Sequence, residues 1–335
     1  MKNNRELPVI AISIGDVNGI GPEVTLKSFL RSDLFDMCRP VVYGPGGVVE
    51  YYNAQLGLQL DVNLCASEND AREGSINVIS VEGSFEASAI GAPSAESGRG
   101  SILAIEAAFA AALSGQASAM VTAPISKEAI ALAGSPFHGH TDMLASLCKA
   151  EHDGLMILSS NTMNVGLVTV HVPLREVADL ISREQVLDTI RRGYHAMVQD
   201  FGISEPRIAV LGLNPHGGDG GVLGDEDEKH VLPAVEDAQA EGWLVDGPFP
   251  ADGFFSAHTK QMYDLIIAMY HDQGLVPFKM QAKGRGVNVT AGLPIVRTSP
   301  DHGTAYNIAS HGLASPESMK EAVHFAHTIA LNRLS

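Results

Sequence analysis

LIIAMYHDQGLVPFKM, residues 265–280, begins as an apolar run and ends as a polar segment that contains glycine. We expect the apolar residues to form a buried strand, and the residues from Tyr270 onward, including His271 and Lys279, to form the loop after it. In open α/β sheets, ligands bind beyond the carboxyl ends of the strands. The stretch therefore predicts an α/β fold with a polar site at this strand end. A histidine that only hydrogen-bonds the turn is the plainer interpretation of this stretch taken alone.

Two other apolar runs also lead to a histidine. VGLVTVHVPLR, residues 165–175, contains His171, and RIAVLGLNPHGGDGG, residues 207–221, places His216 in a glycine-rich loop. If the sheet brings these strand ends together, His171, His216 and His271 form a cluster of three imidazoles. Three neutral protein ligands with an open coordination position are typical of a catalytic zinc site. No CxxC or HExxH spacing accompanies them, so the prediction depends on the strand ends meeting.

The composition limits the class of protein. The 335 residues are 45% hydrophobic and 18% charged, which predicts a sizeable core in two domains or one large α/β unit. The net charge of −17 disfavours nucleic acid and anionic membranes as partners. Three widely spaced cysteines indicate a reducing compartment. No apolar run approaches the roughly 18 residues of a membrane span, and the first one is too short for a signal peptide. We therefore expect a cytoplasmic protein without membrane or nucleic-acid partners.

The amino-terminal region shows a strand, a loop and a helix start. PVIAISI, residues 8–14, predicts a buried strand, GDVNGIG, residues 15–21, a glycine-rich loop, and Pro22 the first turn of a helix. This geometry suits a ligand, although a plain tight turn explains it equally well. The loop matches neither GxGxxG nor the P-loop pattern, so a dinucleotide fingerprint is absent. Asp16 and Asn18 are the polar groups that the loop offers.

The rest of the chain alternates between predicted strands and helices. Further strands are expected over residues 40–43, 63–66, 76–81, 119–122, 154–158, 165–170 and 208–212. Helices are expected over residues 47–56, 101–113, 184–201 and 225–239, with Ser126 as a helix N-cap, residues 84–100 as an exposed loop and residues 247–255 as a turn carrying Asp252. The pattern indicates alternating βα units.

Polar and cationic residues gather in the last two thirds of the chain. GSPFHGHTDML, residues 134–144, breaks the alternation and contains His140 and Thr141; capping of the next helix by Thr141 or Asp142 is the plainer interpretation. Lys279, Asn288 and Arg297 supply cations and an amide. Arginine suits bidentate capture of phosphate or carboxylate, so these residues favour a small anionic substrate, with solvated surface charge as the alternative.

The motifs GHTDML, HVPLREV, LNPHGGDGG, GPFPADGFF, YHDQGLVPFK, GRGVNVTAGLPIVRTS and DHGTA occur in this order along nearly the whole chain. Together they resemble the 4-hydroxythreonine-4-phosphate dehydrogenase family of pyridoxal phosphate biosynthesis. The resemblance implies two α/β domains with a cleft between them, as in isocitrate and isopropylmalate dehydrogenases. We expect the first domain over residues 1–135 and 310–335 and the second over residues 136–309. The resemblance also implies a homodimer whose active site is shared between chains.

The resemblance also implies roles for particular residues. The metal ligands fall on His171, His216 and His271, with His271 supplied by the neighbouring chain, and zinc is expected, with cobalt, manganese or magnesium as alternatives. The substrate contacts fall on His140, Thr141, Lys279, Asn288 and Arg297. The cofactor, NAD or NADP, is expected near His302 and Gly303. Candidates for catalytic roles are His140, Lys279, Asp252 and Asp272, the two aspartates as second ligand shell or proton-transfer groups.

The implied reaction is oxidation of the 3-hydroxyl of 4-phosphohydroxy-L-threonine by NAD, followed by loss of carbon dioxide to give 3-amino-2-oxopropyl phosphate. Two alternatives remain open: dehydrogenation of 4-phospho-D-threonate or 4-phospho-D-erythronate by the same site, and a metal-dependent phospho-sugar aldolase or phosphometabolite-binding protein that needs no nicotinamide. The chain departs from the family pattern in the loop at Gly15–Gly19, which is GDVNG instead of a Gly-Glu/Asp-Pro-Ala-Gly type, and at Val222, where many members carry histidine.

Overall fold

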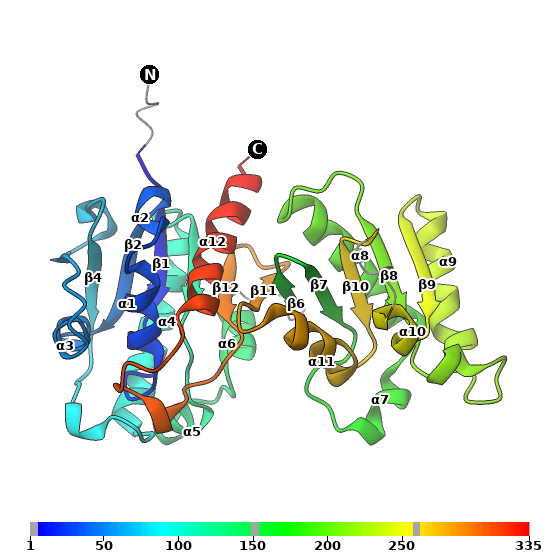
Figure 1. Ribbon diagram of the computed structural model, residues 1–335, viewed down its shortest axis with the longest axis horizontal. Coiled ribbons are helices and arrows are strands. Elements are labelled where there is room, and N and C mark those ends of the chain that lie inside the picture. Colours follow the sequence, from blue (N-terminus) through cyan, green and yellow to red (C-terminus); the bar gives the residue numbers. More distant parts are fainter. Residues whose placement is uncertain (1–5, 149–153, 257–261, 335) are drawn as a thin grey trace. The chain divides into compact units, whose positions relative to one another are not determined.

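The computed structural model describes residues 6–148, 154–256 and 262–334. The chain divides into two compact units, which we call unit 1 (residues 1–154 and 293–331) and unit 2 (residues 155–292 and 332–335). Each unit combines strands of a β-sheet with helices that follow them in sequence (Figure 1). The predicted α/β class is therefore confirmed.

The sheet of unit 1 consists of parallel strands in the order β3-β4-β2-β1-β5-β12. Its strands are β1 (Val9–Ser13), β2 (Arg39–Pro45), β3 (Val62–Leu64), β4 (Ile76–Val81), β5 (Ala119–Thr122) and β12 (Arg297–Pro300). Every residue of β1 is buried, as expected for a central parallel strand that is covered on both faces. The strand predicted from PVIAISI is thus the middle of this sheet.

Seven α-helices of unit 1 are described: α1 (Gly21–Phe29), α2 (Leu34–Met37), α3 (Val48–Gln55), α4 (Ala95–Leu113), α5 (Lys127–Leu132), α6 (His140–Cys148) and α12 (Glu317–Asn332). The predicted loop over residues 84–100 was wrong in its second half, because α4 begins at Ala95. Ser94 forms a capping box there, its hydroxyl accepting from the N–H of Ser97. Ser126 caps α5 as predicted, accepting from the N–H of Ala129.

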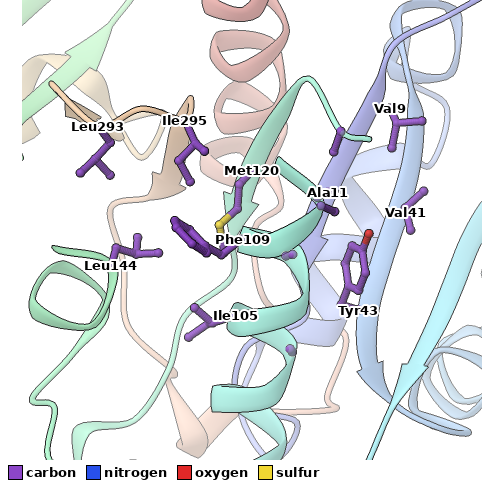
Figure 2. Close-up of a cluster of buried hydrophobic side chains, with 14 of the residues drawn as sticks. Val9, Ala11, Val41, Tyr43, Ile105, Phe109, Met120, Leu144, Leu293 and Ile295 are labelled. Atoms are coloured by element: carbon purple, nitrogen blue, oxygen red, sulfur yellow. The ribbon is translucent and has the colours of Figure 1, made fainter. Parts of the chain in front are cut away.

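The hydrophobic core of unit 1 explains where the unit ends in sequence. Ile105 and Phe109 of α4 pack in one buried cluster with Met120 of β5, and Leu144 of α6 and Ile295 join the same cluster (Figure 2). The expected boundaries assigned residues 136–154 and 293–309 to the second domain, whereas both segments belong to unit 1. Leu144 and Ile295, which belong to these two segments, are buried in this core.

The sheet of unit 2 is mixed, with the order β11-β6-β7-β10-β8-β9. Its strands are β6 (Leu155–Ser160), β7 (Met163–Leu167), β8 (Arg207–Leu211), β9 (Leu244–Phe249), β10 (Leu265–Ala268) and β11 (Val287–Ala291). Its α-helices are α7 (Leu174–Leu180), α8 (Arg183–Gln199), α9 (Leu232–Ala240), α10 (Ala251–Ser256) and α11 (His271–Ala282). Strand β6 is antiparallel to both neighbours, while β7, β10, β8 and β9 are mutually parallel.

The stretch that opens the sequence analysis folds as a strand followed directly by a helix. The expectation of a loop from Tyr270 onward was wrong, because α11 begins at His271 and continues past Lys279 to Ala282. The Gln273 side chain accepts from the N–H of Met269 and fixes the helix start. Gly274 allows the helix to pack closely on β7, since a Cβ there would lie 2.8 Å from Val165. Within the described ranges, no helix is long and apolar enough to span a membrane.

Candidate active site

The three strand-end histidines of unit 2 follow β7, β8 and β10, which are adjacent in the sheet. The ring centroids of His171 and His271 lie 5.8 Å apart, with the ring planes tilted by 39°. His271 Nδ1 lies 2.8 Å from a carboxylate oxygen of Asp272. A proton on Nδ1 that is donated to this carboxylate leaves Nε2 as the metal-binding nitrogen, as in many carboxylate–histidine–metal sites. This pair is therefore suited to ligating a metal ion.

His216 is exposed and lies in a short 3-10 turn with a left-handed backbone, φ 55°. The loop is fixed by the buried carboxylate of Asp227, which accepts from the N–H groups of Leu213 and Asn214. Val222, one of the two departures from the family pattern named in the sequence analysis, is 79% exposed. No group of three or more His, Cys, Asp or Glu side chains among the described residues is placed to hold a metal ion. One chain thus brings together His171 and His271, and the three-histidine set stays a prediction.

The other predicted site residues of unit 2 occupy three different elements. Lys279 is exposed on α11, on the same helix as His271. Asp252 is exposed in the first turn of α10, a helix where a turn had been predicted. Asn288 of β11 is half-buried, and its Oδ1 is enclosed without a hydrogen-bond partner among the described residues. An enclosed amide oxygen without a partner is a natural contact for a ligand.

Unit 1 brings together Arg297 and His140. The Arg297 guanidinium is buried and donates to the Thr122 hydroxyl at 2.6 Å, and burial lowers the pKa of Arg297 to about 10. His140 opens α6 and is half-buried as a residue, while its Nε2 is fully enclosed with no hydrogen-bond partner in the described part of the chain. Burial, and then the positive charge of Arg297, lower the pKa of His140 well below 6.5. The imidazole is therefore neutral at physiological pH.

The start of α6 differs from the helix caps that the sequence suggested. Thr141 is exposed and lies inside the first turn of α6, next to His140. The Asp142 carboxylate accepts from the N–H of His138, ahead of the helix. Thr141 and Asp142 are thus residues of the first turn rather than cap residues that precede it.

The carboxylate of Asp16, in the glycine-rich loop after β1, is buried, and its role differs in part from the prediction. Asp16 was predicted to offer its polar group to a ligand, but it accepts from the hydroxyls of Tyr306 at 2.7 Å and Ser97 at 3.1 Å. Burial raises the pKa of Asp16, and the Tyr306 hydrogen bond lowers it in part. The Asn18 side chain also bonds within the protein, because its amide donates to the carbonyl of Ala92 at 3.0 Å. The glycine-rich loop is thus tied to its neighbours by its own polar groups.

The predicted cofactor residues precede Tyr306 in sequence. His302 is half-buried, with Nδ1 lying 3.2 Å from the carbonyl oxygen of Gly303, and Gly303 is exposed. The Tyr306 hydroxyl reaches the Asp16 carboxylate, so this segment is anchored at the first loop. No local pattern marks Tyr306; only the spacing of four residues from His302 would have drawn attention to it.

The histidines at adjacent strand ends of unit 2 and, separately, the enclosed arginine–histidine pair of unit 1 are arrangements typical of α/β enzymes that act on small anionic ligands. The family model described as pyridoxal phosphate biosynthetic protein PdxA matches residues 36–326. The chain belongs to this family, and the resemblance indicated by the motifs is confirmed.

Individual relatives match over nearly their full length. The 4-hydroxythreonine-4-phosphate dehydrogenase of Prosthecochloris aestuarii is 46% identical over 331 residues, which cover 97% of this chain and 98% of the relative. The crystal structure of the Klebsiella pneumoniae enzyme of the same name superposes with a TM-score of 0.87 at 36% identity, covering 98% and 99% of the two chains. A terephthalate 1,2-cis-dihydrodioldehydrogenase from Burkholderia xenovorans superposes with a TM-score of 0.65 at 27% identity, covering 96% and 98%.

Proposed function

We propose that this chain is a metal- and NAD-dependent 4-hydroxythreonine-4-phosphate dehydrogenase. It oxidises the 3-hydroxyl of 4-phosphohydroxy-L-threonine, and the product loses carbon dioxide to give 3-amino-2-oxopropyl phosphate. The observation that carries the proposal is the similarity over 97% of the chain to a dehydrogenase of that name. The residues of both units, described above, fit the chemistry that this reaction requires.

Arg297 is proposed to bind an anionic group of the substrate. Its guanidinium presents a planar fork of donors, and the hydrogen bond to Thr122 fixes its orientation before the substrate arrives. Burial excludes water, so the interaction with an anion is stronger than on the surface. Lys279, Asn288 and Thr141 complete the proposed substrate contacts.

His140 is proposed to contact the substrate and to move a proton. Its imidazole is neutral because burial and Arg297 disfavour the charged form. A neutral imidazole can accept a proton at one nitrogen while it donates from the other, which suits a group that removes the hydroxyl proton. The enclosed Nε2 is the nitrogen that we assign to donating a hydrogen bond to the substrate.

His171 and His271 are proposed to ligate a divalent metal ion, with Asp272 holding the His271 ring in place. The resemblance implied that His271 comes from the neighbouring chain; because one chain brings His171 and His271 together, we propose instead that His216 completes the set in a homodimer that shares its sites between chains. Imidazole ligands favour zinc, and a bound divalent ion would supply Lewis-acid polarisation of a substrate oxygen. We assign the NAD-binding segment to His302 and Gly303; the nicotinamide supplies the hydride acceptor when bound.

NADH formation by purified protein tests the proposal. The 4-phosphohydroxy-L-threonine substrate is compared with 4-phospho-D-threonate, each with and without a metal chelator. We expect turnover of the first substrate that the chelator abolishes and added zinc restores. Preference for the second substrate would replace the proposed substrate and leave a dehydrogenase. Absence of NADH with either substrate, in the presence of added metals, would contradict the dehydrogenase proposal.

A further inference from the structure

We propose that Ser13 completes a phosphate-binding set in unit 1 together with Thr122, Arg297 and His140. We call these four residues the Ser13 set. The inference rests on the proposed function, because it assigns the phosphate group of the substrate to this set. Ser13 is a residue to which neither the motifs nor the reaction had given a role.

The sheet places these residues on one face. Strand β5 lies between β1 and β12, and the register pairs Ser13 with Thr122 and Arg297 with Met120. Side chains paired in register point to the same face, and so do residues two apart on one strand. Thr122 is two residues beyond Met120, so Ser13, Thr122 and Arg297 share a face.

The same face explains why the set lies at the end of the core. Ala11, Met120 and Ile295 belong to the hydrophobic cluster of unit 1 (Figure 2). They stand two residues before Ser13, Thr122 and Arg297 respectively, with Ile295 in the bend that precedes β12. The apolar face thus becomes polar at Ser13 and Thr122, the last residues of β1 and β5, which is the end of the strands where open α/β sheets bind ligands. Arg297, the first residue of β12, reaches this end through its hydrogen bond to Thr122.

Oγ of Ser13, a residue with 0% exposure, and Nε2 of His140 are buried polar atoms of the set without a hydrogen-bond partner among the described residues. Buried polar groups in native proteins are nearly always hydrogen-bonded, and an unmade bond costs free energy. Beside them, the Arg297 guanidinium donates to Thr122, and its charge acts on His140. Buried polar atoms without hydrogen-bond partners, next to a buried cation, indicate that a bound anion forms hydrogen bonds with them.

The chemistry of the set favours phosphate over carboxylate. Arg297 offers a fork of N–H donors, and the two hydroxyls and the imidazole can each donate one more hydrogen bond. A phosphate group presents three strong acceptor oxygens to such converging donors, whereas a carboxylate has two. The two carboxylates nearest in sequence already accept other hydrogen bonds, Asp142 from the N–H of His138 and Asp16 from the hydroxyls of Tyr306 and Ser97.

Ser13→Ala tests the inference, with inorganic phosphate as the probe and thermal unfolding of the whole chain as the measurement. Without phosphate, the variant should unfold at or slightly above the wild-type temperature, because an idle hydroxyl is removed. With phosphate, the wild type should be stabilised, and the variant should need about tenfold more phosphate for the same shift, since a hydrogen bond to a charged group is lost. A hydroxyl with a merely structural role would lower the unfolding temperature without phosphate.

Ser159→Ala is the matched control. Ser159 is also a serine with 0% exposure whose hydroxyl has no partner among the described residues, but it lies on β6 of unit 2. It should keep the wild-type response to phosphate. The inference is overturned if phosphate does not stabilise the wild type, if Ser13→Ala responds like the wild type, or if both variants lose the response equally.

Turnover separates this inference from the proposed function. In the dehydrogenase assay, Ser13→Ala should raise KM for the phosphorylated substrate about tenfold with little change in kcat, because the lost contact is made to the phosphate group, which does not itself react. If the wild type forms no NADH, the proposed function fails, while the phosphate titration still decides the role of Ser13. If turnover occurs and Ser13→Ala has an unchanged KM, the proposed function stands and the Ser13 inference fails.

Discussion

His171 and His271 bring their ring centroids to 5.8 Å because the strands that precede them are direct neighbours. Strands β7 and β10 pair in parallel, and the pairing continues past the strands with the N–H of Thr169 donating to the carbonyl of Met269. Each histidine follows two residues beyond this last hydrogen bond. The proximity of the two imidazoles is therefore set by the register of a parallel pair, not by a local motif.

Replacement of His271 by alanine should abolish metal binding. The variant removes one of the two imidazoles that a single chain brings together. Removal of a group that only hydrogen-bonds a metal ligand costs roughly 10- to 100-fold in metal affinity or activity. We expect the losses in bound zinc and in NADH formation to be larger than this. Metal content by elemental analysis and turnover check this. His311→Ala, a change at an exposed histidine of unit 1, serves as the control. Full metal content in His271→Ala would remove this residue from the ligand set.

Asp272→Asn should weaken the metal site without destroying it. The amide can still accept from His271 Nδ1, but it lacks the negative charge that makes the ring a better ligand, so we expect about a 10- to 100-fold loss of metal affinity. Competition of the enzyme with a chelator of known affinity measures the change. Asp179→Asn, at an exposed aspartate of α7, is the matched control. Equal affinities for both variants would contradict the orienting role of Asp272.

The strand-end histidines were predictable because apolar runs and their ends are local features of the sequence. Helix α11 was missed because Gly274 and Pro277 read as turn residues. In the structure, Gly274 instead permits close packing on β7, so a tertiary contact overrides its local preference.

The polar network of unit 1 could not be predicted for a different reason. The hydrogen bond between Asp16 and Tyr306 joins residues from opposite ends of the chain. The first and last segments meet only because β12 pairs with β5 beside β1. The register that aligns Ser13 with Thr122 is likewise a property of the assembled sheet, which periodicity within one segment does not reveal.

His140 should make the stability of the protein depend on pH. Its pKa in the folded state lies well below 6.5, the ordinary value, so below pH 6.5 the unfolded state binds a proton that the folded state refuses. The contribution of His140 to the free energy of unfolding is therefore constant above pH 6.5. Below pH 6.5 the free energy of unfolding falls as the pH drops toward the pKa of His140 in the folded state, by at most about 1.4 kcal/mol per pH unit. Urea unfolding at about pH 7.5 and about pH 5.5 measures this slope.

His140→Asn should flatten that slope, because asparagine does not titrate. His327 has a pKa that burial also lowers, so some slope remains in the variant and only the difference from the wild type is diagnostic. A steeper or unchanged slope in His140→Asn would show that His140 is not held neutral in the folded protein.

Tyr306→Phe should destabilise the protein more at neutral pH than in acid. The lost hydroxyl donates to the Asp16 carboxylate, and a hydrogen bond to a charged group contributes about 1.5–3 kcal/mol. Burial raises the pKa of Asp16, and this hydrogen bond counteracts the rise, so the effect of the variant shrinks as falling pH protonates Asp16. Chemical unfolding of the variant and the wild type at about pH 7 and about pH 4 measures the change.

Tyr263→Phe is the matched control for Tyr306→Phe. Tyr263 also donates to a carboxylate, that of Asp246 at 2.9 Å, but the Asp246 side chain is 49% exposed and water can replace the lost donor. We expect Tyr263→Phe to lower the free energy of unfolding by less than Tyr306→Phe does at neutral pH. A larger cost for Tyr263→Phe would mean that burial of the accepting carboxylate does not determine the effect.

Gly98→Ala and Gly253→Ala should change stability in opposite directions, although both glycines lie in helices. A Cβ at Gly98 of α4 would lie 2.0 Å from the carbonyl oxygen of Ala129, so α4 and α5 would have to separate, at a cost of about 1–3 kcal/mol. A Cβ at Gly253 of α10 meets nothing within 4 Å, so alanine should gain about 0.5–1 kcal/mol from reduced chain entropy. Urea unfolding of both variants measures the two changes. Stabilisation by Gly98→Ala would contradict the close packing of α4 on α5.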